Sequence, residues 1–93
     1  MAKVRAHLVV TGRVQGVGFR YTTQDTANRL GIKGWVKNLA NGDVQIEAEG
    51  EVKMVYQFID LIKAGPSRPA NVEHVDLSIT EELSHYKKFD IHY

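Results

Sequence analysis

The sequence predicts an α+β fold in which an antiparallel sheet is covered on one face by two helices. Segments with period-two apolar spacing and segments with helical spacing follow in the order β-α-β-β-α-β. An Asn-Gly pair between the two central strands is a strong hairpin signal. Residues 89–93 then alternate as a short terminal strand. This order is that of the ferredoxin-like βαββαβ sandwich, with one strand added at the C-terminus.

The first half of the chain predicts a strand, a helix and a second strand. Apolar residues at 4, 6, 8 and 10 alternate with polar ones, which indicates a half-buried strand. A helix is expected directly after Arg20, over residues 21–30, and Gly31 is a typical helix stop. Its apolar face comprises Phe19, Thr23, Ala27 and Leu30. The next strand is expected over residues 32–38.

The second half predicts a strand, a helix and two further strands. Residues 43–50 alternate, with Val44, Ile46 and Ala48 toward the core. We interpret Glu47, Glu49 and Glu51 as a solvated acidic edge. A helix is expected from Glu51 to Gly65-Pro66, followed by a strand around Val75–Ile79. The apolar stripe of this helix comprises Val52, Val55, Ile59 and Ile62.

The loop at residues 10–20, Val-Thr-Gly-Arg-Val-Gln-Gly-Val-Gly-Phe-Arg, is the most informative stretch for function. Gly16 and Gly18 allow backbone N–H groups to approach a ligand closely. The helix that follows adds the positive end of its dipole, and Arg20 adds a planar fork of donors. These features predict an oxyanion site, although a plain tight turn has the same glycines. The spacing matches neither a P-loop nor a dinucleotide fingerprint.

The predicted topology brings a second residue to this loop. The first two strands are parallel and joined by a helical crossover, so their C-terminal ends lie at the same end of the sheet. One strand separates them, a distance of roughly 10 Å at about 4.8 Å per strand. Arg20 follows the first strand and Asn38 ends the second. We therefore expect Arg20 and Asn38 at one site.

Composition narrows the classes of function. The 93 residues suffice for one domain, 1–93, and the absence of cysteine excludes disulfides, thiolate catalysis and Cys-based zinc sites. A net charge of +1 gives no indication of a nucleic-acid partner. No apolar run has membrane-spanning length and no signal peptide is visible, so we expect a cytoplasmic protein. The four histidines lack metal-binding spacing, and we expect neither metal nor cofactor.

Two motifs resemble those of the acylphosphatases. The first, aliphatic-x-Gly-x-Val-Gln-Gly-Val-x-Phe-Arg, is met by residues 10–20. The second, Gly-aromatic-aliphatic-basic-Asn, then Gly-x-Val and a further Gly, is met by residues 34–38 with Gly42, Val44 and Gly50. The resemblance extends over essentially the whole chain, including Gly65-Pro66 and the aromatic C-terminus.

The resemblance implies hydrolysis of acyl phosphates to a carboxylate and inorganic phosphate, without metal or covalent intermediate. It assigns phosphoryl binding to Arg20 with the loop amides, and orientation of the attacking water to Asn38. The amides are those of Gln15, Gly16, Val17, Gly18, Phe19 and Arg20. The partners it implies are a small acyl phosphate as substrate and inorganic phosphate as product and inhibitor. We expect a monomer that binds neither nucleic acid nor membranes.

Two other functions remain open at this point. The same fold occurs in RNA-recognition domains, but these carry aromatic residues on a central strand, and residues 43–49 have none. An acylphosphatase-like domain of a larger maturation enzyme is the second alternative. A chain that starts at Met1 and stops three residues after Asp90 favours a free-standing enzyme.

Overall fold

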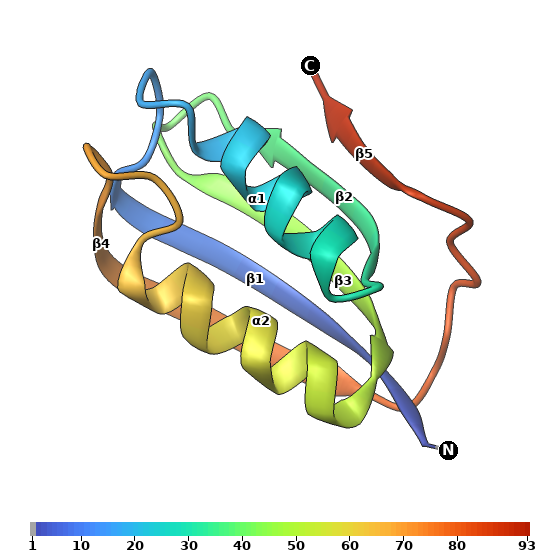
Figure 1. The fold of residues 1–93 in the computed structure, drawn as a ribbon. Coiled ribbons are helices and arrows are strands. Elements are labelled where there is room, and N and C mark those ends of the chain that lie inside the picture. Colours follow the sequence, from blue (N-terminus) through green and yellow to red (C-terminus); the bar gives the residue numbers. More distant parts are fainter. Residues whose placement is uncertain (1) are drawn as a thin grey trace.

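The protein forms a five-stranded sheet with both helices packed on one face (Figure 1). The computed structural model describes residues 2–93, so Met1 of the predicted domain 1–93 lies outside the described residues. The elements are β1 Lys3–Arg13, α1 Phe19–Arg29, β2 Lys33–Asn38, β3 Val44–Glu51, α2 Val52–Ala64, β4 Asn71–Thr80 and β5 Phe89–His92.

The strand order is β4-β1-β3-β2-β5, which confirms the predicted ferredoxin-like arrangement. β1 pairs with β3 and β4, and β2 pairs with β3, all antiparallel. The terminal strand β5 pairs parallel with β2, so the complete sheet is mixed. Because β3 lies between β1 and β2, the C-terminal ends of β1 and β2 point the same way, as the sequence predicted.

The core fills the space between the sheet and the helices. Phe19, Thr23 and Ala27 of α1 are buried, which confirms the predicted apolar face of that helix. In α2 the buried side chains are Val55, Phe58, Ile59 and Ile62, while Val52 is only partly covered. Phe58 therefore belongs to the apolar face of α2, although the sequence analysis did not include it. Its ring centre lies 6.2 Å from that of Phe89.

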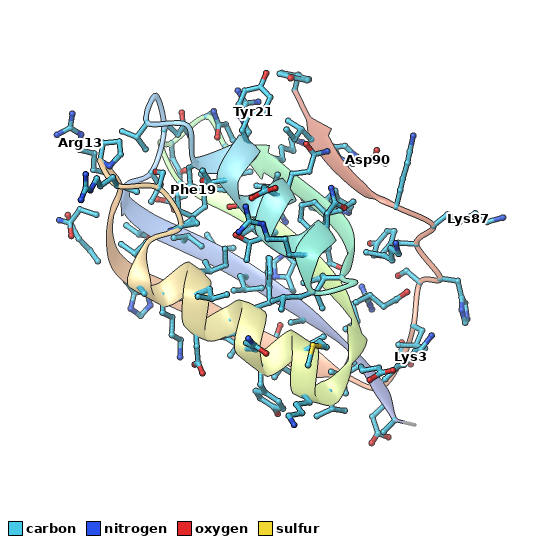
Figure 2. All side chains as sticks on the ribbon, viewed as in Figure 1. Lys3, Arg13, Phe19, Tyr21, Lys87 and Asp90 are labelled. Carbon is cyan, nitrogen blue, oxygen red and sulfur yellow. The ribbon has the colours of Figure 1, made fainter. Side chains whose placement is uncertain are left out.

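The predicted start of α1 is wrong by two residues. The helix begins at Phe19, because Gly18 is its N-cap at φ 74° and makes the turn out of the loop. Arg20 therefore lies in the first turn of α1 rather than before it. Figure 2 shows the neighbouring Tyr21 directed outward from this turn, on the side of the C-terminus.

The predicted acidic edge is also wrong for two of its three carboxylates. Glu47 and Glu49 are only 4% and 6% exposed, whereas Glu51 is exposed. The segment 81–88, which links β4 to β5, covers both: Glu49 accepts hydrogen bonds from the amides of Ser84 and Tyr86, at 2.6 and 3.1 Å. Glu47 accepts from the Tyr86 hydroxyl at 3.2 Å. These bonds offset the cost of removing the carboxylates from water.

At Gly34 the backbone of the adjacent strand leaves no space for a side chain. Gly34 has φ +147°, and a Cβ added there would lie 1.9 Å from the carbonyl oxygen of Glu47 on the adjacent strand. Since that neighbour is backbone at the centre of the sheet, it cannot move without disturbing the β2–β3 pairing.

We expect Gly34→Ala to lower the free energy of unfolding by more than about 3 kcal/mol, since an overpacking clash adds to a positive-φ penalty. The measurement is urea unfolding followed by circular dichroism. The control is Gly31→Ala, which also has a positive φ of 69° but meets nothing within 4 Å. Equal losses in the two variants would contradict the close approach.

Candidate functional site

The loop between β1 and α1 is held at its ends and shaped by two glycines. Val14 and Phe19 are 1% and 2% exposed, so both ends of the loop are anchored in the core. Between them Gly16 and Gly18 adopt φ of 73° and 74°. Because side chains other than glycine are strained at these angles, the path of the loop depends on both residues.

The amino-terminal end of α1 is open to a ligand. Within residues 2–93 no side chain caps the helix, and its first turn has no acidic residue. The first N–H groups of a helix have no partner within the helix and carry the positive end of its dipole. With the preceding loop, they form a place where an anion is favoured.

Arg20 is held against the C-terminal strand. Its Nη1 donates to the carbonyl of His92 at 3.3 Å, and its guanidinium carbon lies 4.8 Å from the centre of the Tyr93 ring. The Tyr93 hydroxyl lies 3.5 Å from that of Tyr21. This hydrogen bond is the main cause that raises the pKa of Tyr93, against the smaller opposing effect of Arg20. The contacts fix the guanidinium while leaving further N–H groups for an anion.

Asn38 ends β2 with an unused acceptor. Its side chain lies on the helix side of the sheet, the same face as the buried Val36 two residues earlier. The Oδ1 atom is buried and has no hydrogen-bond partner within residues 2–93. Buried polar atoms are normally paired, so an acceptor of this kind marks a place for a water or a ligand group.

The structure brings Arg20, Asn38 and the loop to one end of the sheet. Lys37 is paired with His92, the residue whose carbonyl accepts from Arg20, and Asn38 follows Lys37 directly. The loop reaches the same place, since the Gln15 side chain donates to the carbonyl of Leu39 at 2.8 Å. In Figure 1 the start of α1 lies beside the ends of β2 and β5.

Sequence reasoning missed two groups at this site. It assigned Gln15 only through its backbone amide, and it interpreted Tyr93 as part of a strand that ties down the C-terminus. The Gln15 side chain bonds to a residue 24 positions away in the sequence, and Tyr21 and Tyr93 are 72 positions apart. Contacts between such distant residues leave no pattern in the sequence. Trp35 lies on the open face of the sheet, where it donates to the Tyr86 hydroxyl and stacks on His92.

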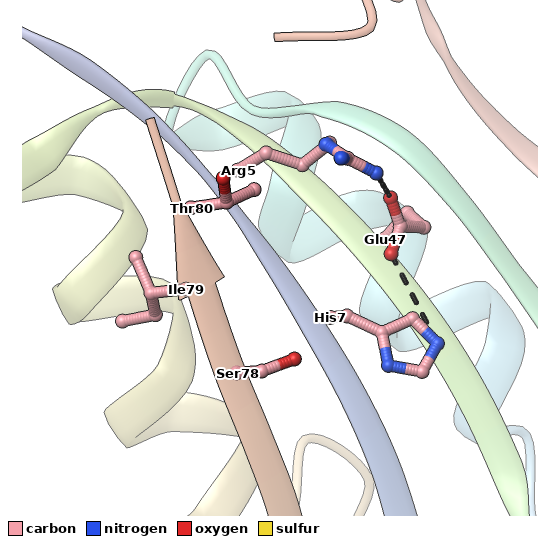
Figure 3. Close-up of a pocket in the computed structure, with 6 residues that line it drawn as sticks. All are labelled: Arg5, His7, Glu47, Ser78, Ile79 and Thr80. Atoms are coloured by element: carbon pink, nitrogen blue, oxygen red, sulfur yellow. Dashed lines mark hydrogen bonds and ion pairs between the residues drawn. The ribbon is translucent and has the colours of Figure 1, made fainter. Parts of the chain in front are cut away.

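A cavity of about 300 Å³ lies on the opposite, open face of the sheet and is lined by Arg5, His7, Glu47, Ser78, Ile79 and Thr80 (Figure 3). Its charged groups are already paired. Arg5 Nη1 donates to Glu47 Oε1 at 2.7 Å, which raises the pKa of Arg5, and His7 Nε2 lies 3.9 Å from Glu47 Oε2. A ligand there would have to compete with the Arg5–Glu47 pair, so this cavity is a weaker candidate than the loop.

No group of three or more His, Asp or Glu side chains within residues 2–93 could hold a metal ion. Neither of the two helices there has the length and apolar character needed to cross a membrane.

Comparisons with known proteins agree on one family. A family model described as acylphosphatase matches residues 6–91. An acylphosphatase of Listeria monocytogenes serotype 4b is 48% identical over 93 residues, covering all of both chains. The crystal structure of the Bacillus subtilis acylphosphatase has a TM-score of 0.93 at 37% identity, covering 97% of this chain and 99% of that one. Full-length HypF matches 97% of this chain with 12% of its own, at 31% identity and a TM-score of 0.82.

Proposed function

The chain belongs to the acylphosphatase family, hydrolases that act on acyl phosphates, and we propose how its residues divide that reaction. Arg20 and the backbone amides of residues 15–20 bind the phosphoryl group. Asn38 orients the water that attacks phosphorus. The domain 1–93 acts as a cytoplasmic monomer, and inorganic phosphate is both product and competitive inhibitor.

Phosphoryl binding follows from the charges at the start of α1. The uncapped helix end and the loop amides supply fixed donors, and the guanidinium supplies a fork that matches two phosphate oxygens. Phosphoryl transfer needs mainly positioning and stabilisation of charge on the equatorial oxygens. Donors held by the core at Val14 and Phe19 require little rearrangement when that charge develops.

Water orientation follows from the buried Asn38 oxygen. An amide is far too weak a base to take a proton. However, Oδ1 can accept a hydrogen bond from the water and so direct a lone pair of the water oxygen toward phosphorus. The single observation that supports the proposal most is this unpartnered acceptor, placed one residue beyond the strand pair that receives Arg20.

The remaining chemistry needs no further protein group. The water oxygen bonds to phosphorus while the bond from phosphorus to the acyl oxygen breaks, and the electron pair leaves with the carboxylate. A carboxylate is a good leaving group, so no general acid is required. We infer that the proton of the water passes to a phosphate oxygen. The chain has no cysteine, and the proposed reaction involves no covalent intermediate.

The proposal is tested by hydrolysis of benzoyl phosphate, followed by the loss of its ultraviolet absorbance. We expect turnover without added metal and no change with a chelator. A strict requirement for a divalent ion would contradict the mechanism, and absence of hydrolysis would contradict the function.

Arg20→Ala should weaken competitive inhibition by inorganic phosphate and nearly abolish turnover. Loss of a charge-assisted contact of about 1.5–3 kcal/mol corresponds to roughly 10- to 150-fold weaker phosphate binding. Arg20→Lys should restore little, because an ammonium cannot reproduce the planar fork. Arg29→Ala is the matched control, since Arg29 lies on the same helix and pairs with the exposed Asp25. Full activity of the lysine variant would refute bidentate binding.

Asn38→Ala should reduce turnover by about 10²- to 10³-fold, the cost of removing one preorganised polar group. Inhibition by phosphate should change little, because the loop and Arg20 remain. The turnover number and the inhibition constant of phosphate are both measured in one series of hydrolysis assays at increasing phosphate concentration. Asn41→Ala controls for the turn, since the Asn41 side chain accepts from the Asp43 amide at 3.0 Å. If both variants lose turnover equally, Asn38 acts only through the turn.

A further inference from the structure

We propose that the Gln15 side chain is a positioning residue that locks the phosphate-binding loop to the β2–β3 turn and thereby fixes the phosphoryl group relative to Asn38. The inference rests on the proposed function. It assigns to this side chain a role separate from that of its own backbone amide.

The link consists of two short hydrogen bonds from one nitrogen. Gln15 Nε2 donates to the carbonyl of Leu39 and to that of Asp43, each at 2.8 Å. These carbonyls close the turn from its two sides: the Leu39 amide donates to Asp43 at 2.8 Å, and the Gly42 amide donates to Leu39 at 3.2 Å. Each carbonyl therefore has one lone pair used within the turn and one that accepts from Gln15.

The turn end of the link is adjacent to Asn38. Leu39 follows Asn38 directly, and Asn38 is paired with Val44, the residue after Asp43. Both carbonyls that accept from Gln15 are thus next to the residue pair that ends the hairpin ladder. A shift of the turn that moves Asn38 must break or bend these two bonds.

The loop end of the link lies between the anchored Val14 and the left-handed Gly16. Within residues 2–93 no backbone hydrogen bond joins the loop 14–18 to the turn 39–43, so Gln15 makes their hydrogen-bonded connection. Without it, the turn keeps its own hydrogen bonds, but no backbone hydrogen bond within residues 2–93 replaces the connection to the loop.

This connection matters because in-line attack is sensitive to distance. A misplacement of about 1 Å between reacting groups can cost around 10²-fold in rate. The side chain must also be of one length and type. Asparagine is one methylene shorter, and glutamate would place an oxygen against two carbonyl oxygens.

Gln15→Met tests the proposal, because methionine keeps the length and lacks the donors. The matched control is Gln45→Met. Gln45 is also half-exposed, and its Nε2 lies 2.8 Å from the His7 ring on the open face, away from the site. Amide hydrogen exchange should accelerate in Gln15→Met at Leu39 and Gly42, whose amides are hydrogen-bonded within the turn, and should not accelerate there in Gln45→Met.

With benzoyl phosphate, Gln15→Met should lower kcat by about 10- to 100-fold, with little change in phosphate inhibition, while Gln45→Met keeps wild-type kcat. In an Asn38→Ala background the same change should cost little more, because the group it positions is gone. The inference is overturned by unchanged exchange, by kcat equal to that of Gln45→Met, or by additive losses with Asn38→Ala. An inactive wild-type protein contradicts the proposed function, and exchange at Leu39 and Gly42 then still decides whether the Gln15 link holds the turn.

Discussion

The pairing of β3 with both β1 and β2 determines where the other parts of the protein can lie. Because β3 is antiparallel to both strands, β1 and β2 run parallel to each other on either side of it. The loop after β1 and Asn38 at the end of β2 therefore lie at the same end of the sheet. The contact is close: at Gly34 the backbone of β2 leaves no space for a Cβ beside Glu47 of β3. The distance between loop and Asn38 is thus set by the width of one strand before any site residue is considered.

The two faces of β3 meet different requirements. On the helix side Val44, Ile46 and Ala48 are fully buried, and this packing needs nothing beyond apolar side chains. On the other side Glu47 and Glu49 are buried without helices above them. Their charges are matched by Arg5 and by donors from the segment 81–88. That segment also leads the chain to β5, whose last carbonyl positions Arg20. The polar network on one face and the anion site on the other are therefore connected through β5.

Local patterns explain what sequence analysis could predict. Periodicity found each helix and strand, and the two motifs with the topology placed Arg20 and Asn38 together. The burial of Glu47 and Glu49 was missed because it depends on residues 35 to 39 positions away, in a segment without periodicity. The start of α1 was misplaced because the left-handed conformation of Gly18, which lets the helix begin at Phe19, is not visible in the apolar periodicity. The Gln15 bonds depend on a carbonyl geometry that only the folded turn creates.

Three features that suit a bound ligand occur together where β1 enters α1 and β2 ends. The loop has two glycines at positive φ, α1 lacks a side-chain cap, and Asn38 has a buried acceptor without a partner. The uncapped amides of α1 and the Asn38 oxygen are unsatisfied in the unliganded protein, and a bound oxyanion or water would satisfy them. The two glycines let the loop amides approach that ligand closely. Violations of local rules are expected where a protein binds a ligand. The link from Gln15 belongs to the same logic, because donors that are left unsatisfied are useful in catalysis only if they are held at a fixed distance.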